Sequence, residues 1–192
     1  MSWSQLTLFE GSPESYRKVY IDGGRIPINR GMALGKRIAN ALETGEETGD
    51  PIMDLVISQI PKLDIMEAEL RGTIKIGKIE IPMFGKADTA KKNLTAFKEY
   101  KTGKTRWTKK QADNHGQITL YCTIIRAMTG KIPKDIELVH ALTQELPDGK
   151  FELTGDVYRI KTSRALKDIL QMEVRIKKAW EGIGQMCEEE LL

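Results

Sequence analysis

The sequence predicts an α/β fold with a central mixed β-sheet flanked by helices. Three observations lead to this prediction: apolar residues recur at helical spacing before residue 60, polar and apolar residues alternate from 65 to 101, and helix-like and strand-like segments then alternate. The chain has 192 residues, of which 40% are hydrophobic and 30% charged, as in ordinary globular proteins. We expect a single domain, with N-terminal helices over 4–43, a core over 65–145, and a strand plus a long helix over 151–190.

Helices are expected before residue 62, because prolines and glycines stand at the ends of the apolar-periodic segments. Pro13 suits the first turn of a helix, Gly45 closes one, and Pro61 ends another. The expected helices cover 4–20 in two pieces broken at Gly11, then 31–45 and 52–60.

Strands are expected from residue 65 to 101, where tight turns at Gly77-Lys78 and at 91–93 separate the alternating segments. We expect a meander of antiparallel strands over 67–76, 77–83, 84–90 and 95–101. A polar, basic loop over 101–116 follows. After it the sequence predicts a buried helix over 117–130, strands over 135–144 and 151–162, and an amphipathic helix from 163 onward.

Composition limits the classes of function. Two cysteines, Cys122 and Cys187, provide neither a disulfide framework nor a four-ligand metal cluster, and fit a reducing compartment. The N-terminus lacks a signal-peptide pattern, and no apolar run approaches membrane-spanning length. We therefore expect a cytoplasmic protein with no membrane partner. The net charge of +3 permits nucleic-acid binding without arguing for it.

The segment FKEYKTGK places Glu99 and Lys101 on one face of a predicted strand, because side chains two residues apart share a face. An exposed ion-pair ladder would explain this pattern without any function. Asp88, however, lies on the preceding strand, and the turn at 91–93 brings the two carboxylates to neighbouring positions. Such a pair suits a hard cation, Mg²⁺ or Mn²⁺, and a lysine beside it can stabilise the charge that develops in phosphodiester hydrolysis.

Gln117 and Tyr121 stand four residues apart and therefore share one face of the predicted helix. A capping glutamine and a core tyrosine would be the structural explanation. Their position after Asp88 and after Glu-x-Lys favours a role in the same site.

These motifs, G-x-x-D, then E-Y-K-T-G, then Q-x-x-x-Y, resemble the PD-(D/E)XK nuclease superfamily in its RecB-type, lambda-exonuclease-like branch. The segment SWSQLTLFEGSPESYRKVY is similar to the opening motif of that branch, and GKRIANALE is similar to its Gly-x-x-x-His-x-x-Leu-Glu helix. The resemblance covers residues 2 to about 125 and looks most like phage-encoded members.

The resemblance implies a metal-dependent DNA nuclease, an exonuclease rather than an endonuclease, in phage DNA recombination or processing. It makes Asp88, Glu99 and the backbone carbonyl of Tyr100 the metal ligands and Lys101 the catalytic cation, with Gln117 and Tyr121 orienting the strand that is cut. It also implies DNA as partner, a single-strand-annealing or other recombination protein as a possible second partner, a possible homo-oligomer, and the cytoplasm of a bacterial host.

Two positions depart from the family pattern. Ser12 stands where iron–sulfur members have cysteine, so we expect no iron–sulfur cluster. Ala39 stands where many members have the helix histidine. Glu43, one turn further on, is a candidate replacement ligand, although a solvated side chain is the simpler explanation. A catalytically silent DNA-binding relative therefore remains an alternative, as does a coincidental carboxylate pair.

The basic loop is the last candidate feature. As a functional element it would bind the DNA backbone around one stacking tryptophan, and as a structural element it is a solvated loop anchored by that side chain. His115 and His140 receive no role, because their spacing suggests no zinc motif. The candidate DNA-binding residues are Lys104, Arg106, Trp107, Lys109 and Lys110.

Overall fold

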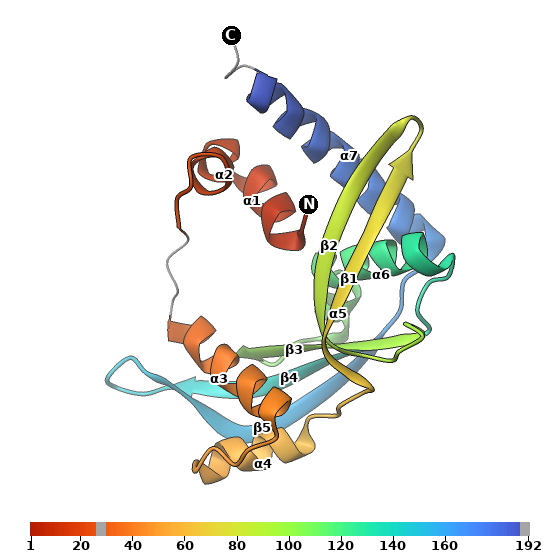
Figure 1. Cartoon of the computed structure of the whole chain (residues 1–192). Coiled ribbons are helices and arrows are strands. Elements are labelled where there is room, and N and C mark those ends of the chain that lie inside the picture. The colour runs from red at the N-terminus through yellow and green to blue at the C-terminus, as the bar shows by residue number, and fades with distance from the viewer. Residues whose placement is uncertain (26–29, 189–192) are drawn as a thin grey trace.

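Residues 1–25 and 30–188 of the chain are described by the computed structural model, apart from the side chains of residues 30–32, and five strands in these ranges form one mixed sheet in sequence order (Figure 1). Neighbouring strands are antiparallel except β3 and β4, which are parallel. The α/β fold with a mixed sheet is thus confirmed. The strands are β1 (Ile65–Ile76), β2 (Ile79–Ala90), β3 (Ala96–Gly103), β4 (Asp135–Glu145) and β5 (Phe151–Thr162).

The prediction of a four-stranded meander was wrong in its strand count and in its pairing. The segments 77–83 and 84–90 are parts of one strand, β2. Pro82 does not interrupt it, because the backbone of Pro82 and Phe84 faces the outer edge of the hairpin, where the Met1 backbone bonds both residues. A proline at such an edge removes no ladder hydrogen bond. The strand expected over 95–101 pairs mainly with β4, in parallel.

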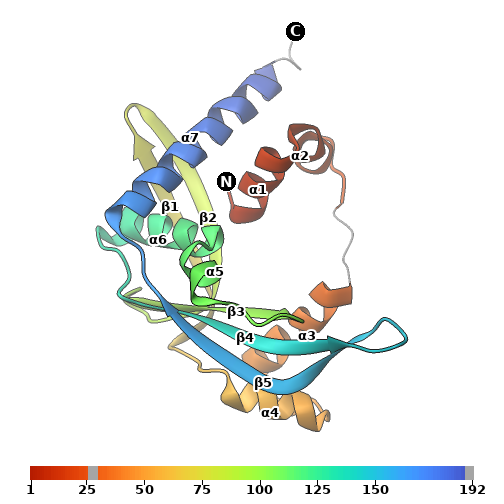
Figure 2. The ribbon, with the colours of Figure 1, turned by 180° about the vertical axis from the view of Figure 1, so that it is seen from behind.

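The sheet divides where β2 leaves β3. The register joins them at only two pairs, Thr89 with Lys98 and Ala90 with Phe97, whereas β1 and β2 pair along nearly their whole length. The β1–β2 hairpin consequently rises away from the β3–β5 part of the sheet in both views (Figures 1 and 2). Beyond Lys98, the edge of β3 that faces β2 therefore has no ladder partner in the described ranges, and we call this place the fork.

Helices cover both faces of the sheet. On one face, α1 (Trp3–Gly11), α6 (Gly116–Thr129) and α7 (Leu166–Glu188) bury an apolar core with β1, β2 and Phe97. On the other face, α3 (Arg30–Thr44) and α4 (Pro51–Gln59) pack on Val139 and Ala141 of β4. Residues 189–190, which the sequence included in the last helix, lie outside the described residues.

The predicted basic loop contains a short helix, α5 (Lys109–Asp113), so its description as a loop throughout was incomplete. Thr108 caps this helix in a capping box, since its hydroxyl accepts from the Gln111 backbone and the Gln111 side chain accepts from the Thr108 backbone. The two N-terminal pieces appear as predicted, as α1 and α2 (Pro13–Tyr20). In the described ranges, no helix combines the length and apolar character needed to cross a bilayer.

Candidate active site

Asp88 and Glu99 meet at the fork. Thr89 pairs with Lys98 in the ladder, so Asp88 and Glu99 are the next positions on the two strands, at the point where these separate. The Tyr100 backbone N–H donates to Asp88 Oδ2 at 2.5 Å, and the charge of Asp88 acts on the Glu99 carboxyl group and raises its pKa. The fork thus brings together the two carboxyl groups that the sequence paired.

Burial makes this pair hard to ionise. It raises the pKa of Asp88 to about 6 and, together with the neighbouring charge of Asp88, raises the pKa of Glu99 to about 8. The positive charge of the Lys101 ammonium partly offsets this effect, because it lowers the pKa of both carboxyl groups. Glu99 is 2% exposed, and its Oε2 atom is buried without a hydrogen-bond partner among the described residues. A buried carboxylate oxygen with a free lone pair and no donor is suited to a cation.

Lys101 connects this pair to α6 through a chain of hydrogen bonds. Its Nζ donates to Glu99 Oε1 at 2.6 Å and to Gln117 Oε1 at 2.9 Å. Gln117 Nε2 in turn donates to the Tyr121 hydroxyl at 2.7 Å, and that hydroxyl donates to the Lys86 carbonyl at 2.8 Å. Glu99, Lys101, Gln117 and Tyr121 thus form one hydrogen-bonded chain of side chains. Asp88, the fifth sequence-predicted residue, lies beside this chain and is held by the Tyr100 backbone N–H.

Gly85 on β2 makes this arrangement possible. A Cβ atom at this position would come within 2.8 Å of the Tyr121 ring, which is closer than real Cβ contacts. Tyr121 is buried, and its ring lies edge-on to Phe97. The absence of a side chain at Gly85 thus allows the tyrosine to reach the β2 backbone.

Arg164 holds the start of α6, and with it Gln117. Its buried guanidinium donates to the carbonyls of Ala112 and His115 and to the Thr119 hydroxyl. Sequence reasoning missed this residue, because its partners are about fifty positions away along the chain.

The two histidines lie near the site. Burial, followed by the charges of Lys101 and Arg164, lowers the pKa of His115 to about 4, so the ring is neutral at physiological pH. His140 is fully buried beside Lys101 in the β3–β4 register, and burial lowers its pKa as well. Neither residue contributes positive charge to the site at neutral pH.

The residues at the fork fit a hard cation. In a strand, the N–H and C=O of one residue face the same neighbour. Because the Tyr100 N–H is directed at Asp88, its carbonyl also faces the fork, where it can complete a set of oxygen ligands with Asp88 and Glu99. No group of three or more His, Cys, Asp or Glu side chains in the described part of the chain is arranged as a metal cluster. The oxygen donors that Asp88, Glu99 and Tyr100 bring to the fork are therefore two carboxyl groups and one carbonyl.

A third carboxylate, Glu67, stands near the pair and was missed by sequence reasoning. In the β1–β2 register the residues on either side of Glu67 pair with those on either side of Asp88, so the two residues lie opposite each other. The charge of Glu67 contributes to the raised pKa of Asp88. Its φ is 51°, an uncommon conformation for a residue other than glycine, and its side chain pairs with Lys86. Alternation along β1 was the only sequence signal available for this position.

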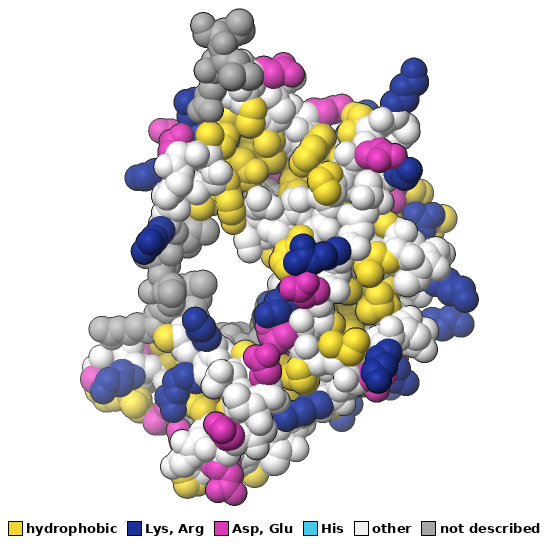
Figure 3. All heavy atoms as spheres, in the orientation of Figure 1, with side chains coloured by type: hydrophobic (Ala, Val, Ile, Leu, Met, Phe, Trp, Pro, Cys, Tyr) yellow, Lys and Arg dark blue, Asp and Glu magenta, His cyan; other side chains and the backbone are white. Residues whose placement is uncertain are grey.

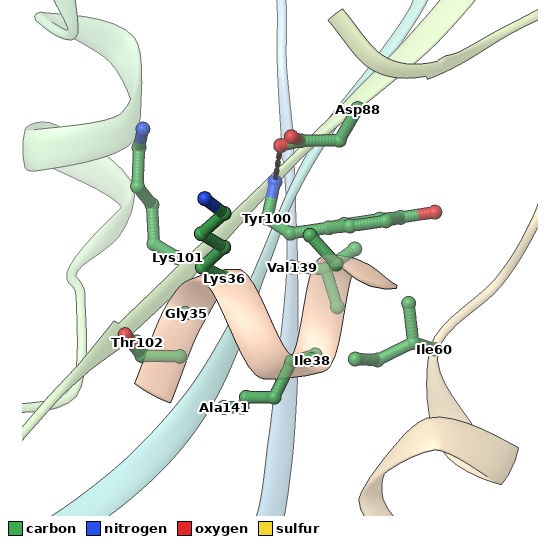
Figure 4. Close-up of a pocket in the computed structure, with 11 residues that line it drawn as sticks. Gly35, Lys36, Ile38, Ile60, Asp88, Tyr100, Lys101, Thr102, Val139 and Ala141 are labelled. Atoms are coloured by element: carbon green, nitrogen blue, oxygen red, sulfur yellow. Dashed lines mark hydrogen bonds between the residues drawn. The ribbon is translucent and has the colours of Figure 1, made fainter. Parts of the chain in front are cut away.

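A pocket of about 480 Å³ opens between α3 and the sheet next to the pair (Figure 4). Asp88 and Lys101 line it together with Ala39, the residue predicted to stand at the place of a helix histidine. Lys36, one turn earlier on α3, also lines the pocket and was missed by sequence reasoning. Glu43 is exposed, and its charge contributes to the raised pKa of Lys86. It is not among the groups that change the pKa of Asp88 or of Glu99.

The basic-loop residues have varied surroundings. Lys104 pairs with Glu145 and Lys109 with Asp113. Arg106 lies over the Tyr158 ring at 4.1 Å, while half-buried Trp107 packs edge-on to His115 at 5.0 Å between ring centroids. Lys110 is exposed. In Figure 3, acidic and basic side chains gather on the sheet side of the opening at the centre of the view.

No protein-family model and no curated protein matches the chain, but solved structures do. The crystal structure of SSO0001 is 15% identical, with 91% of this chain and 69% of that chain covered and a TM-score of 0.47. An alkaline exonuclease from Laribacter hongkongensis, LHK-Exo, is also 15% identical, with 98% and 90% covered and a TM-score of 0.45. Candida albicans Rai1, in complex with pU5-Mn²⁺, is 10% identical, with 79% and 49% covered and a TM-score of 0.27.

Proposed function

We propose that the chain is a nuclease that hydrolyses phosphodiester bonds of DNA with the help of Mg²⁺ or Mn²⁺. One observation carries the proposal: Asp88 meets a buried Glu99 whose Oε2 has no hydrogen-bond partner among the described residues, beside a lysine that a glutamine holds in place. An exposed ion-pair ladder, the structural explanation of EYK, would leave Glu99 in solvent, whereas it is 2% exposed.

Asp88, Glu99 and the Tyr100 carbonyl would hold the metal, which supplies Lewis-acid activation of the phosphate and of the attacking water. Lys101 would place its positive charge beside the phosphate as negative charge builds up in the transition state. Gln117 would fix the Lys101 ammonium in position, since its amide oxygen accepts from Nζ at 2.9 Å. Tyr121 would fix the Gln117 amide and keep it from rotating.

The specific version of the proposal is an exonuclease in phage DNA recombination or processing, acting in the cytoplasm of a bacterial host. It rests on the resemblance of the motifs, which also suggests a single-strand-annealing partner and a homo-oligomer. A catalytically silent DNA-binding relative is the second candidate, favoured by Ala39 at the place of the helix histidine. The complete group of Asp88, Glu99 and Lys101 favours the active enzyme.

The test is incubation of the purified protein with linear and circular DNA, single and double stranded, with Mg²⁺, Mn²⁺ or EDTA. We expect cleavage with either metal and none with EDTA. Loss of linear DNA with circular DNA intact would identify an exonuclease. Binding of DNA without cleavage under any metal condition would instead identify the silent relative.

A further inference from the structure

The pocket beneath α3 has a polar end and an apolar end (Figure 4). The amines of Lys36 and Lys101 lie at the same end as the Asp88 carboxylate. Four apolar side chains line the other end, and the Tyr100 ring lies along the side. The apolar residues are Ile38, Ile60, Val139 and Ala141.

We propose that this pocket binds the nucleobase of an unpaired nucleotide whose phosphate lies at Asp88 and Lys101. The proposal rests on the proposed nuclease function and specifies the substrate of the same site. It makes the enzyme selective for single-stranded or frayed DNA, because a base can enter the pocket only after it has left the helical stack.

Small residues on α3 keep the pocket open. Gly35 and Ala39 are four residues apart and so lie on one helical face, toward the sheet. A Cβ atom at Gly35 would meet only the Thr102 hydroxyl, at 3.8 Å, so the helix is not closely packed there. The volume of about 480 Å³ lies within the roughly 300–1,000 Å³ typical of small-molecule sites.

The chemistry of the walls suits a flat aromatic ligand attached to an anion. The Tyr100 hydroxyl donates to the Pro61 carbonyl at 2.8 Å, which fixes the ring as part of the wall. Aromatic and apolar walls accept any base, because every base has a π-face. Lys36 is exposed at the mouth and has no ion-pair partner among the described residues, so its ammonium is available for a phosphate.

The test uses short single-stranded oligonucleotides that carry 2-aminopurine, a fluorescent base, at the 5′ or the 3′ end. Binding is followed in Ca²⁺ without turnover, and cleavage in Mg²⁺ is compared with oligonucleotides that lack the terminal base. Ala39→Leu fills the pocket from α3, and Ala33→Leu adds the same side chain at an exposed position of the same helix. Thr102→Leu, which fills the pocket from β3, serves if Ala39→Leu does not fold.

For the wild type and Ala33→Leu, we expect a change in 2-aminopurine fluorescence at one end and about a tenfold lower kcat/KM without the base. Ala39→Leu should lose the fluorescence change and cleave the two substrates about equally. Equal cleavage with and without the base by the wild type would refute base binding in the pocket, while the proposed nuclease activity would still hold. A fluorescence change that Ala39→Leu abolishes, without cleavage under any metal, would support the pocket and reject the nuclease.

Discussion

The affinity for a divalent cation is expected to rise steeply with pH, because Asp88 and Glu99 bind a proton that the cation must displace. With pKa values raised to about 6 and about 8, the two carboxyl groups hold about one proton between them at pH 7. Raising the pH from about 6 to about 8 removes this competition. The linkage then predicts an increase in affinity of about a hundredfold, which levels off above about pH 8.

The folding stability of the metal-free protein should change in the opposite direction. Both pKa values are raised above the ordinary carboxyl range, so the native state binds more protons than the unfolded chain between about pH 4 and pH 8. Stability is therefore largest at the acid end of this window and falls as the pH rises through the folded-state pKa values. Saturating cation should remove the loss at the alkaline end.

Calorimetric titration with Mg²⁺ in two buffers of different protonation enthalpy measures the number of protons released. We expect about one at pH 7 and close to none at pH 9. Glu80→Gln, which removes an exposed carboxylate on β2, is the matched control and should behave as the wild type. Equal heats in the two buffers at pH 7, or an affinity that stays constant from pH 6 to pH 8, would refute the placement of the cation at this pair.

Four further results are expected. Glu99→Gln should abolish cleavage, measured on linear DNA, while circular dichroism shows an intact fold; full activity would contradict the assigned role. Lys36→Gln should raise KM several-fold and leave the melting temperature within a degree or two, since its side chain is exposed; an unchanged KM would remove it from the site. Iron analysis should find no stoichiometric iron, and a visible absorption band would reverse this expectation. Neutralising the basic loop should weaken DNA binding and flatten its salt dependence, by about one unit of slope for each lost phosphate contact, and an unchanged slope would make it solvated surface. The loop variants are Lys104→Gln, Arg106→Gln, Lys109→Gln and Lys110→Gln.

Local spacing rules account for how the candidate site residues come together, whereas the pairing of the sheet did not follow from such rules. Glu99 and Lys101 share a face by strand alternation, and Gln117 and Tyr121 by helical spacing, so local rules suffice for each pair. Only the meeting of Asp88 with Glu99 required a turn to bring two strands together, and the turn at 91–93 was visible. The pairing of β3 with β4 was not visible in the sequence, because these two parallel strands are connected through α6 and no turn links them directly.

The residues that sequence reasoning missed depend on contacts across elements. In the sequence, Lys36 has the pattern of an ordinary solvated lysine, and only the position of α3 in the fold shows that it lines the pocket with Asp88. Lys98 and Glu137 form a buried ion pair, 2.7 Å between Nζ and Oε2, from strands that the sequence did not pair. The short helix α5 was the exception, since Thr108 and Gln111 have capping-box spacing and could have revealed it.

The fork has a mechanical consequence. Asp88 belongs to the β1–β2 hairpin and Glu99 to the rest of the sheet, while only the pairs Thr89–Lys98 and Ala90–Phe97 join these strands. If the hairpin swings about this short seam, the distance between the two carboxyl groups changes. A cation bound by both carboxylates would link the hairpin to the rest of the sheet. Backbone amides of β2 near Asp88 should then exchange with deuterium more slowly than in the metal-free protein. Assembly of the catalytic centre and stiffening of the hairpin would thus be one event.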